Sequence, residues 1–224
     1  MSRLATTREQ LSAEGYVFLP KFAPELPPRV AFSWLGSIDS VEGLAEIQVL
    51  TPQTETASTP NTYSGNFGTS EFPLHTDLAH WAVPPRYIAL RCLSGTKSVT
   101  TSVLDSLGVV QAVGRETLRM AIVQPRRPLK NGKHLLRLLE KPINVNSDRI
   151  RWDTIFLKPS NEFAAATVAG VRDALRHAQP VQFTLRDPGD TLVLDNWRVF
   201  HGRSPVSSDE LQREIARAYL GVVD

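Results

Sequence analysis

Short strand-like segments recur along this chain, and turn residues separate most of them. The segments are rich in Val, Ile, Leu, Phe, Tyr and Thr, and Gly, Pro, Asn, Asp or Ser stand between them. In chain order they are YVFLP, AEIQVLTP, RYIALRCL, VTTSVLD, HLLRLLEKP, RIRWDTIFLKP, VQFTLRD, TLVLDNW and REIARAYLGVV. Because helices do not alternate with these strands, the pattern favours antiparallel sheets over a parallel sheet.

Two segments have helical features instead. Residues 6–15, TTREQLSAEG, start with Thr and stop at Gly, which predicts a short helix that packs on a sheet. Residues 160–180 carry apolar side chains near helical spacing, with Ser160 as the expected N-cap and Pro180 after the expected end. The apolar positions expected to cover a sheet face are Phe163, Ala166, Val171 and Leu175.

Many short strands with a covering helix predict a mainly β fold. The expected architecture is a double-sheet jelly roll, or double-stranded β-helix, of the cupin kind with a few flanking helices. The chain has 224 residues, which is enough to bury a large core, and all-β folds of this size are often single units. We therefore expect residues 1–224 to form one domain.

The composition argues against several function classes. Charged residues make up 21% of the chain and its formal net charge is +2, without the like-charge blocks or basic stripes of nucleic-acid-binding proteins. No run approaches the roughly 20 apolar residues of a membrane span, and no apolar leader is present at the start. The single cysteine, Cys92, gives no disulfide framework. We expect a cytoplasmic monomer or homodimer that binds a small molecule, with no nucleic acid and no membrane as partner.

Residues 53–71 form a polar stretch, QTETASTPNTYSGNFGTSE, that has neither strand nor helix periodicity. Such a stretch predicts a long loop, and long loops inside a domain often act as lids over a binding site. Asn66 is therefore a candidate for substrate contact.

Side chains of the types that bind metal ions follow this loop. His75 and Asp77 lie two residues apart in FPLHTD, and in extended chain such residues face the same side while Thr76 faces away. A third candidate ligand, His201, follows an apolar strand in DNWRVFHGR. Two histidines and one carboxylate leave other metal positions open, as in non-haem Fe(II) oxygenases, although Zn also accepts these ligands.

Two arginines near the C-terminal end help to choose between these metals. Arg213 and Arg217 lie four residues apart in REIARAYLGVV, so both side chains are expected to point into one cavity. A buried guanidinium is a permanently charged, bidentate partner for a carboxylate and would anchor the far end of a dicarboxylic acid. A hydrolytic zinc site would not require it.

The chain resembles the Fe(II)/2-oxoglutarate dioxygenases of the taurine dioxygenase (TauD/TfdA) superfamily. HTD, the distant DNWRVFHGR and the trailing arginines carry this resemblance, because their joint presence is more specific than any one motif. SGNFGTSEFPLHTD, PPRYIALRCL and IRWD are similar to the clavaminate synthase and amino-acid hydroxylase branch. The resemblance extends roughly from Tyr63 to Tyr219.

The resemblance implies that His75, Asp77 and His201 bind Fe(II) and that Arg213 binds the distal carboxylate of 2-oxoglutarate. Dioxygen would be the second co-substrate, and succinate and CO2 the products. Halogenating relatives lack the carboxylate found here at Asp77, so the resemblance favours hydroxylation, with desaturation or ring closure as further outcomes.

Other roles are implied by position. Thr101 falls where the superfamily has a Thr beside the co-substrate arginine, and Thr100 is the alternative because the local sequence, SGTKSVTT, departs from the superfamily pattern. Arg217 corresponds to an arginine that approaches the co-substrate or an acidic substrate group. Trp81 and Arg151 are further candidates for substrate contact.

We therefore predict oxidation of an amino acid or an amino-acid-derived metabolite, with secondary metabolite biosynthesis as the expected context. One alternative is a cupin-like hydrolase or isomerase that holds Zn or Mn and does not use 2-oxoglutarate. A second alternative is a jelly-roll binding protein without catalysis.

Overall fold

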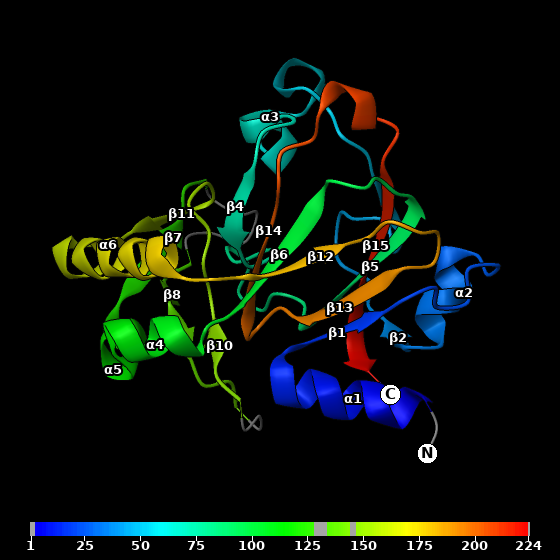
Figure 1. Ribbon diagram of the computed structural model, residues 1–224. Coiled ribbons are helices and arrows are strands. Elements are labelled where there is room, and N and C mark those ends of the chain that lie inside the picture. Colours follow the sequence, from blue (N-terminus) through cyan, green and yellow to red (C-terminus); the bar gives the residue numbers. More distant parts are fainter. Residues whose placement is uncertain (1–2, 128–133, 144–146, 224) are drawn as a thin grey trace.

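The computed structural model describes residues 3–127, 134–143 and 147–223, and two β-sheets form its centre (Figure 1). The larger sheet has the strand order β1 (Tyr16–Leu19), β13 (Thr191–Asp195), β5 (Tyr87–Ser94), β15 (Glu214–Val223) and β2 (Gly36–Ile38), and β3 (Gln48–Leu50) also pairs with β15. The smaller sheet has the order β12 (Val181–Thr184), β6 (Thr100–Asp105), β14 (Val199–Arg203) and β4 (Phe72–His75). Among the described residues these strands pair antiparallel, as predicted.

A hydrophobic core lies between the two sheets, because successive side chains of a strand point to opposite faces. In β5, Ile88 and Leu90 pack into this core with residues of β6 and β14. The intervening Ala89 packs on the outer face with helices α1 (Arg3–Glu14) and α2 (Pro28–Ser33). Both faces of β5 are therefore covered, which explains why its residues before Ser94 are mostly apolar, with Arg91 as the exception.

A second group of elements lies beside the sheets and shares a separate hydrophobic cluster, to which Phe200 of β14 also contributes. In Figure 1, α6 lies at the far left of this group. Its elements are α4 (Leu107–Val113), α5 (Arg115–Met120), α6 (Glu162–His177), β7 (Ile122–Pro125), β8 (Leu136–Arg137), β9 (Leu139–Glu140), β10 (Arg149–Ile150) and β11 (Leu157–Pro159).

The predicted loop 53–71 contains helical turns that the sequence analysis did not anticipate. A 3-10 turn spans Glu55–Ala57, and helix α3 spans Tyr63–Phe67. The Thr62 hydroxyl oxygen accepts a hydrogen bond from the Gly65 backbone N–H at 3.0 Å, which is an N-cap of the usual kind. The segment is thus a folded edge of the cavity described below. A further 3-10 turn spans Ser208–Glu210.

The two predicted helices exist, but the details of α6 differ from the prediction. The cap of α6 is Asn161, whose side-chain oxygen accepts from the Ala164 N–H at 2.8 Å, while the Ser160 hydroxyl donates to the Ile122 carbonyl. Phe163 is 45% exposed and Ala166 is also exposed, so the predicted covering face is wrong at these two positions. The buried positions of α6 are Ala164, Thr167 and Val171.

Helices α2, α4 and α5 were not predicted, since each is short and none shows a clear amphipathic period. Short helices gain their stability from tertiary packing rather than from propensity, so sequence patterns detect them poorly. In the described part of the chain, no helix has the length and apolar character that a bilayer crossing requires.

Gly202 lies where β14 approaches β4 most closely. A Cβ atom at this position would lie 2.6 Å from the Phe72 carbonyl oxygen, which is too short for a non-bonded contact. We expect Gly202→Ala to push the two strands apart and to lower the free energy of unfolding by about 2 kcal/mol, as measured by urea denaturation.

Gly108→Ala is the matched control. Gly108 lies in α4, where a Cβ would meet no atom within 4 Å, and alanine favours the helix. The control is expected to leave the stability unchanged or to raise it by up to about 1 kcal/mol. Equal stabilities of the two variants would show that the β14–β4 contact is not tight.

Candidate metal centre

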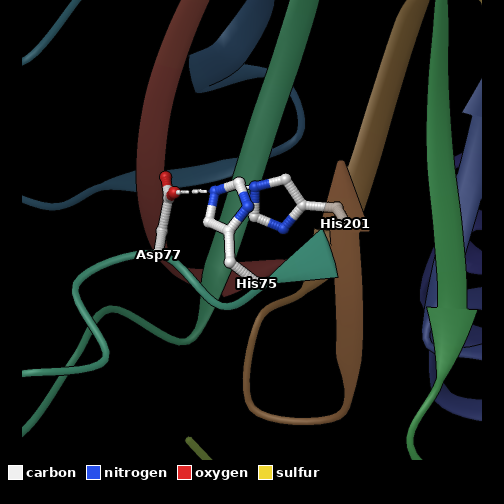
Figure 2. Close-up of side chains that lie close together, drawn as sticks. All are labelled: His75, Asp77 and His201. Atoms are coloured by element: carbon white, nitrogen blue, oxygen red, sulfur yellow. Dashed lines mark ion pairs between the residues drawn. The ribbon is translucent and has the colours of Figure 1, made fainter. Parts of the chain in front are cut away.

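The three predicted metal ligands converge at one point, although His201 is far from His75 and Asp77 in the sequence (Figure 2). His75 is the last residue of β4, and His201 lies opposite it in the antiparallel pairing with β14. Asp77 follows in the turn after β4, where its Oδ1 lies 3.3 Å from His75 Nε2 and 3.5 Å from His201 Nε2. The possible ligand atoms all lie within 4.8 Å of one another.

Hydrogen bonding and burial favour the metal-binding form of both imidazoles. His75 Nδ1 lies 2.8 Å from the Pro73 carbonyl oxygen. A carbonyl oxygen can only accept, so Nδ1 carries the hydrogen and Nε2 of the neutral ring keeps its lone pair. Burial, and then the neighbouring His75, lowers the pKa of His201, which favours its neutral form.

Asp77 is held at both its backbone and its carboxylate. The Asn196 side chain accepts from the Asp77 N–H at 2.7 Å and donates to the Asp77 carbonyl oxygen at 3.0 Å. Tyr219 and Arg217 each donate a hydrogen bond to Asp77 Oδ2 at 2.9 Å. Burial raises the pKa of Asp77, but the charge of the Arg217 guanidinium opposes burial, and this pKa is held well below its usual range.

These residues fit a divalent transition-metal ion. They offer two imidazole nitrogens and one carboxylate oxygen, which are the ligand types of open non-haem iron sites and of many zinc sites. The buried Nδ1 of His201 has no hydrogen-bond partner among the described residues. No other set of His, Cys, Asp and Glu in the described ranges clusters in this way. The ligand types alone do not choose between iron and zinc.

A cavity of about 910 Å³ opens over the three side chains. Arg213 and Arg217 both line it, as their spacing predicts. Thr101 lines it as well, whereas Thr100 does not, because neighbouring side chains of β6 point to opposite faces. Of the two threonines, only Thr101 therefore lines the cavity.

The Arg213 side chain is buried and unpaired. It is 7% exposed, and its Nε has no hydrogen-bond partner. Within the described residues its guanidinium forms no ion pair, since the nearby Glu210 carboxylate is bound to Ser98 and Ser207. Burial lowers the pKa of Arg213, yet a guanidinium remains charged at any physiological pH. A buried cation without a counter-ion is costly, so Arg213 is prepared to receive an anion.

Besides Arg217, two of the predicted substrate-contact residues reach the cavity. Trp81 lines it and is partly buried against the core between the sheets. Asn66 also lines it from α3, where its side-chain amide donates to the Pro60 and Thr62 carbonyl oxygens. The Asn66 amide is thus also engaged in shaping the cavity edge.

Arg151 does not reach the cavity, and its predicted substrate contact is wrong. Its guanidinium donates to backbone carbonyl oxygens of Ala79, Trp81 and Ala82, and it pairs with Glu140. Arg151 therefore fixes the chain that follows Asp77, which is a structural role.

Sequence reasoning missed an aromatic support beneath His75. The Tyr63 ring stacks on the His75 ring with 4.0 Å between centroids, and its hydroxyl donates to Asp153 Oδ2 at 2.9 Å. Asp153 Oδ1 in turn accepts the backbone N–H groups of Ile155 and Phe156, each at 2.7 Å. Burial and the Asp153 carboxylate raise the pKa of Tyr63, so its hydroxyl stays protonated and anchored.

No protein-family model matches the chain, and no curated protein matches it in sequence. Solved structures do. An asparagine oxygenase, in complex with Fe(II), 3-hydroxyasparagine and succinate, aligns with a TM-score of 0.71 and 18% identity over 97% of this chain and 77% of its own. The chain has the fold of the Fe(II)/2-oxoglutarate-dependent oxygenases.

Two further structures agree on this fold. The Fe, alpha-ketoglutarate dependent oxygenase PvcB of Pseudomonas aeruginosa, from an isonitrile synthetic pathway, aligns with a TM-score of 0.70 and 15% identity over 98% of this chain and 80% of its own. The non-heme iron oxygenase OrfP, in complex with Fe and alpha-ketoglutaric acid, aligns with a TM-score of 0.68 and 18% identity over 97% of this chain and 79% of its own. The predicted fold class is confirmed, and so is the resemblance at the level of the fold.

Asn196 makes three buried hydrogen bonds, two to the Asp77 backbone and one to the Pro85 carbonyl oxygen. We expect Asn196→Ala to lower the free energy of unfolding by about 3 kcal/mol, because buried backbone groups lose their partner. Urea denaturation measures this loss. Asn66→Ala is the matched control, since that amide lies on the exposed edge, and a loss below about 0.5 kcal/mol is expected. Similar losses in both variants would contradict the special role of Asn196.

Proposed function

We propose that this protein is a non-haem Fe(II)- and 2-oxoglutarate-dependent oxygenase that acts on a small organic molecule. The observation that carries the proposal is Arg213, a buried and unpaired guanidinium in the cavity that also contains two histidines and a carboxylate. The fold supports it, because solved structures with this fold contain Fe with alpha-ketoglutaric acid or with succinate.

Arg213 favours this function over a zinc or manganese hydrolase or isomerase. Such an enzyme needs the metal ligands but has no use for a buried cation beside them. A dicarboxylic acid satisfies the cation, because a carboxylate and a guanidinium form two parallel, charge-assisted hydrogen bonds. The Thr101 hydroxyl lines the same cavity and is a further donor for that carboxylate.

His75, Asp77 and His201 would hold the iron. Iron bound there, together with 2-oxoglutarate and dioxygen, supplies the oxidation of a C–H bond with release of succinate and CO2. The protein groups keep the ligands in their binding forms, with Asp77 ionised and His201 neutral. Tyr63 and Phe156 line the cavity beside the ligands and exclude water from that side.

The substrate we propose is an amino acid or an amino-acid-derived metabolite. Structural neighbours were solved with 3-hydroxyasparagine and with (3S)-hydroxy-L-Arg, which supports this class. The cavity of about 910 Å³ lies near the top of the range of roughly 300–1,000 Å³ for small-molecule sites, so it has room for 2-oxoglutarate and a substrate of that size. Hydroxylation is the leading outcome, and desaturation or ring closure would use the same site.

The wider setting is also proposed. We infer that residues 1–224 act as one domain, in the cytoplasm, as a monomer or homodimer. We further infer that the partners are small molecules, with neither nucleic acid nor membrane involved. A context in secondary metabolite biosynthesis fits the isonitrile pathway to which one structural neighbour belongs.

Binding of 2-oxoglutarate tests the proposed function directly. Anaerobic addition of Fe(II) and 2-oxoglutarate is expected to give the weak visible charge-transfer absorption of the chelate. Titration of this absorption should show that Arg213→Met weakens 2-oxoglutarate binding about 100-fold, because a buried carboxylate loses its charged partner. Arg213→Lys should retain part of the affinity, since it keeps a positive charge but not the bidentate geometry.

Arg176→Met is the control, because Arg176 is exposed on α6 and pairs only with Asp173. It should bind 2-oxoglutarate as the unmodified protein does. A metal-loaded, folded protein that shows no such absorption would remove the proposed function. A turnover rate that is unchanged by added 2-oxoglutarate and by substitution of Arg213 would favour the hydrolase or isomerase.

A further inference from the structure

The two oxygens of the Asp77 carboxylate have different surroundings. Oδ1 faces Nε2 of both histidines, at 3.3 and 3.5 Å. Oδ2 faces away from them and accepts hydrogen bonds from the Tyr219 hydroxyl and from Arg217 Nη1, each at 2.9 Å. One oxygen is therefore available to a metal ion, and the other is occupied by two protein donors.

The two donors come from the opposite sheet. Arg217 and Tyr219 are two residues apart in β15, so strand alternation places both side chains on the face toward the cavity. Asp77 follows β4 of the smaller sheet. The Asp77 carboxylate is thus tied across the gap between the sheets.

Arg217 is itself held in place. Its Nη2 donates to Gln48 Oε1 at 2.6 Å, and Gln48 lies opposite Arg217 in the pairing of β3 with β15. Its guanidinium also lies over the Tyr219 ring, 5.3 Å from the centroid. Both terminal nitrogens of Arg217 are already engaged, unlike those of Arg213, so Arg217 is poorly placed to be the free anchor for a substrate carboxylate.

We propose that Arg217 and Tyr219 are positioning residues that restrict Asp77 to metal binding through Oδ1 alone. The proposal rests on the metal centre of the proposed function and replaces the substrate role expected for Arg217. If Oδ2 turned toward the ion, both hydrogen bonds would break and the arginine would lose its buried counter-ion, at a high cost in free energy. A carboxylate bound through one oxygen also leaves one more metal position open to ligands from solution.

The two roles of Arg217 predict different measurements. A positioning residue changes the affinity and geometry of the metal site even when no organic ligand is present. A substrate anchor changes the binding of the organic ligand and leaves the metal site as it was. Metal binding in the absence of 2-oxoglutarate therefore discriminates between them.

Co(II) is a suitable probe, because its visible absorption reports the number and geometry of its ligands. The full chain would be titrated with Co(II) without 2-oxoglutarate, for the unmodified protein and for Tyr219→Phe, Arg217→Gln and Arg217→Lys. We expect Tyr219→Phe and Arg217→Gln each to weaken Co(II) binding about tenfold, and to change the absorption spectrum as Oδ2 joins the ligand set. Arg217→Lys keeps a charged donor and should restore part of the affinity and the original spectrum.

Tyr87→Phe and Arg176→Gln are the matched controls. Tyr87 lies on the neighbouring strand β5, with no hydroxyl hydrogen bond among the described contacts, and Arg176 is exposed on α6. Both should bind Co(II) as the unmodified protein does. Thermal unfolding of each variant shows whether it folds. If Arg217→Gln does not fold, Tyr219→Phe still tests the inference, because it removes only one oxygen atom.

Two negative outcomes are distinguishable. If the unmodified protein binds Co(II) but Tyr219→Phe and Arg217→Gln bind it with the same affinity and spectrum, this inference is overturned and the proposed function stands. If the unmodified protein binds no Co(II), the metal centre and the proposed function are overturned together.

Discussion

The pairing of β14 with β4 is the contact on which the site depends. It sets His201 opposite His75, and the turn after β4 then brings Asp77 to the same point. Gly202 allows the strands to approach because it has no Cβ to meet the Phe72 carbonyl oxygen. The smaller sheet thus supplies both imidazoles from rigid, hydrogen-bonded strands, which is the support that a precise metal site requires.

Charge balance divides the cavity into two functional parts. The negative charge of Asp77 is matched inside the protein by Arg217. The positive charge of Arg213 is not matched within the described residues, so the protein leaves its neutralisation to a ligand. A buried ion pair rarely adds stability for its own sake, whereas a buried unpaired ion is a cost that folding must offset. The two arginines line the same cavity but have opposite roles.

The resemblance carried by HTD, DNWRVFHGR and the trailing arginines indicated the principal residues, and the recurring pattern of short strands was sufficient for the fold class. Strand alternation also places Tyr219 on the same face as Arg217, because the two residues are two positions apart in β15. No local sequence pattern indicates the role of Tyr63, since only the folded loop brings its ring onto the His75 ring. Arg151 was misassigned because local sequence does not reveal whether a buried arginine faces a cavity or backbone carbonyl groups. Short helices such as α4 depend on tertiary packing, which a local pattern does not contain.

Asn196 links parts of the chain that would otherwise move separately. It lies in the turn between β13 and β14, and its side chain binds both the N–H and the carbonyl oxygen of Asp77, so the turn that leads into the strand of His201 is tied to a second ligand. A movement of this turn would carry Asp77 and the start of the His201 strand together, so the positions of two of the three ligands are coupled. We therefore expect exchange of a bound ion to need a cooperative opening of this turn rather than fluctuations of single side chains.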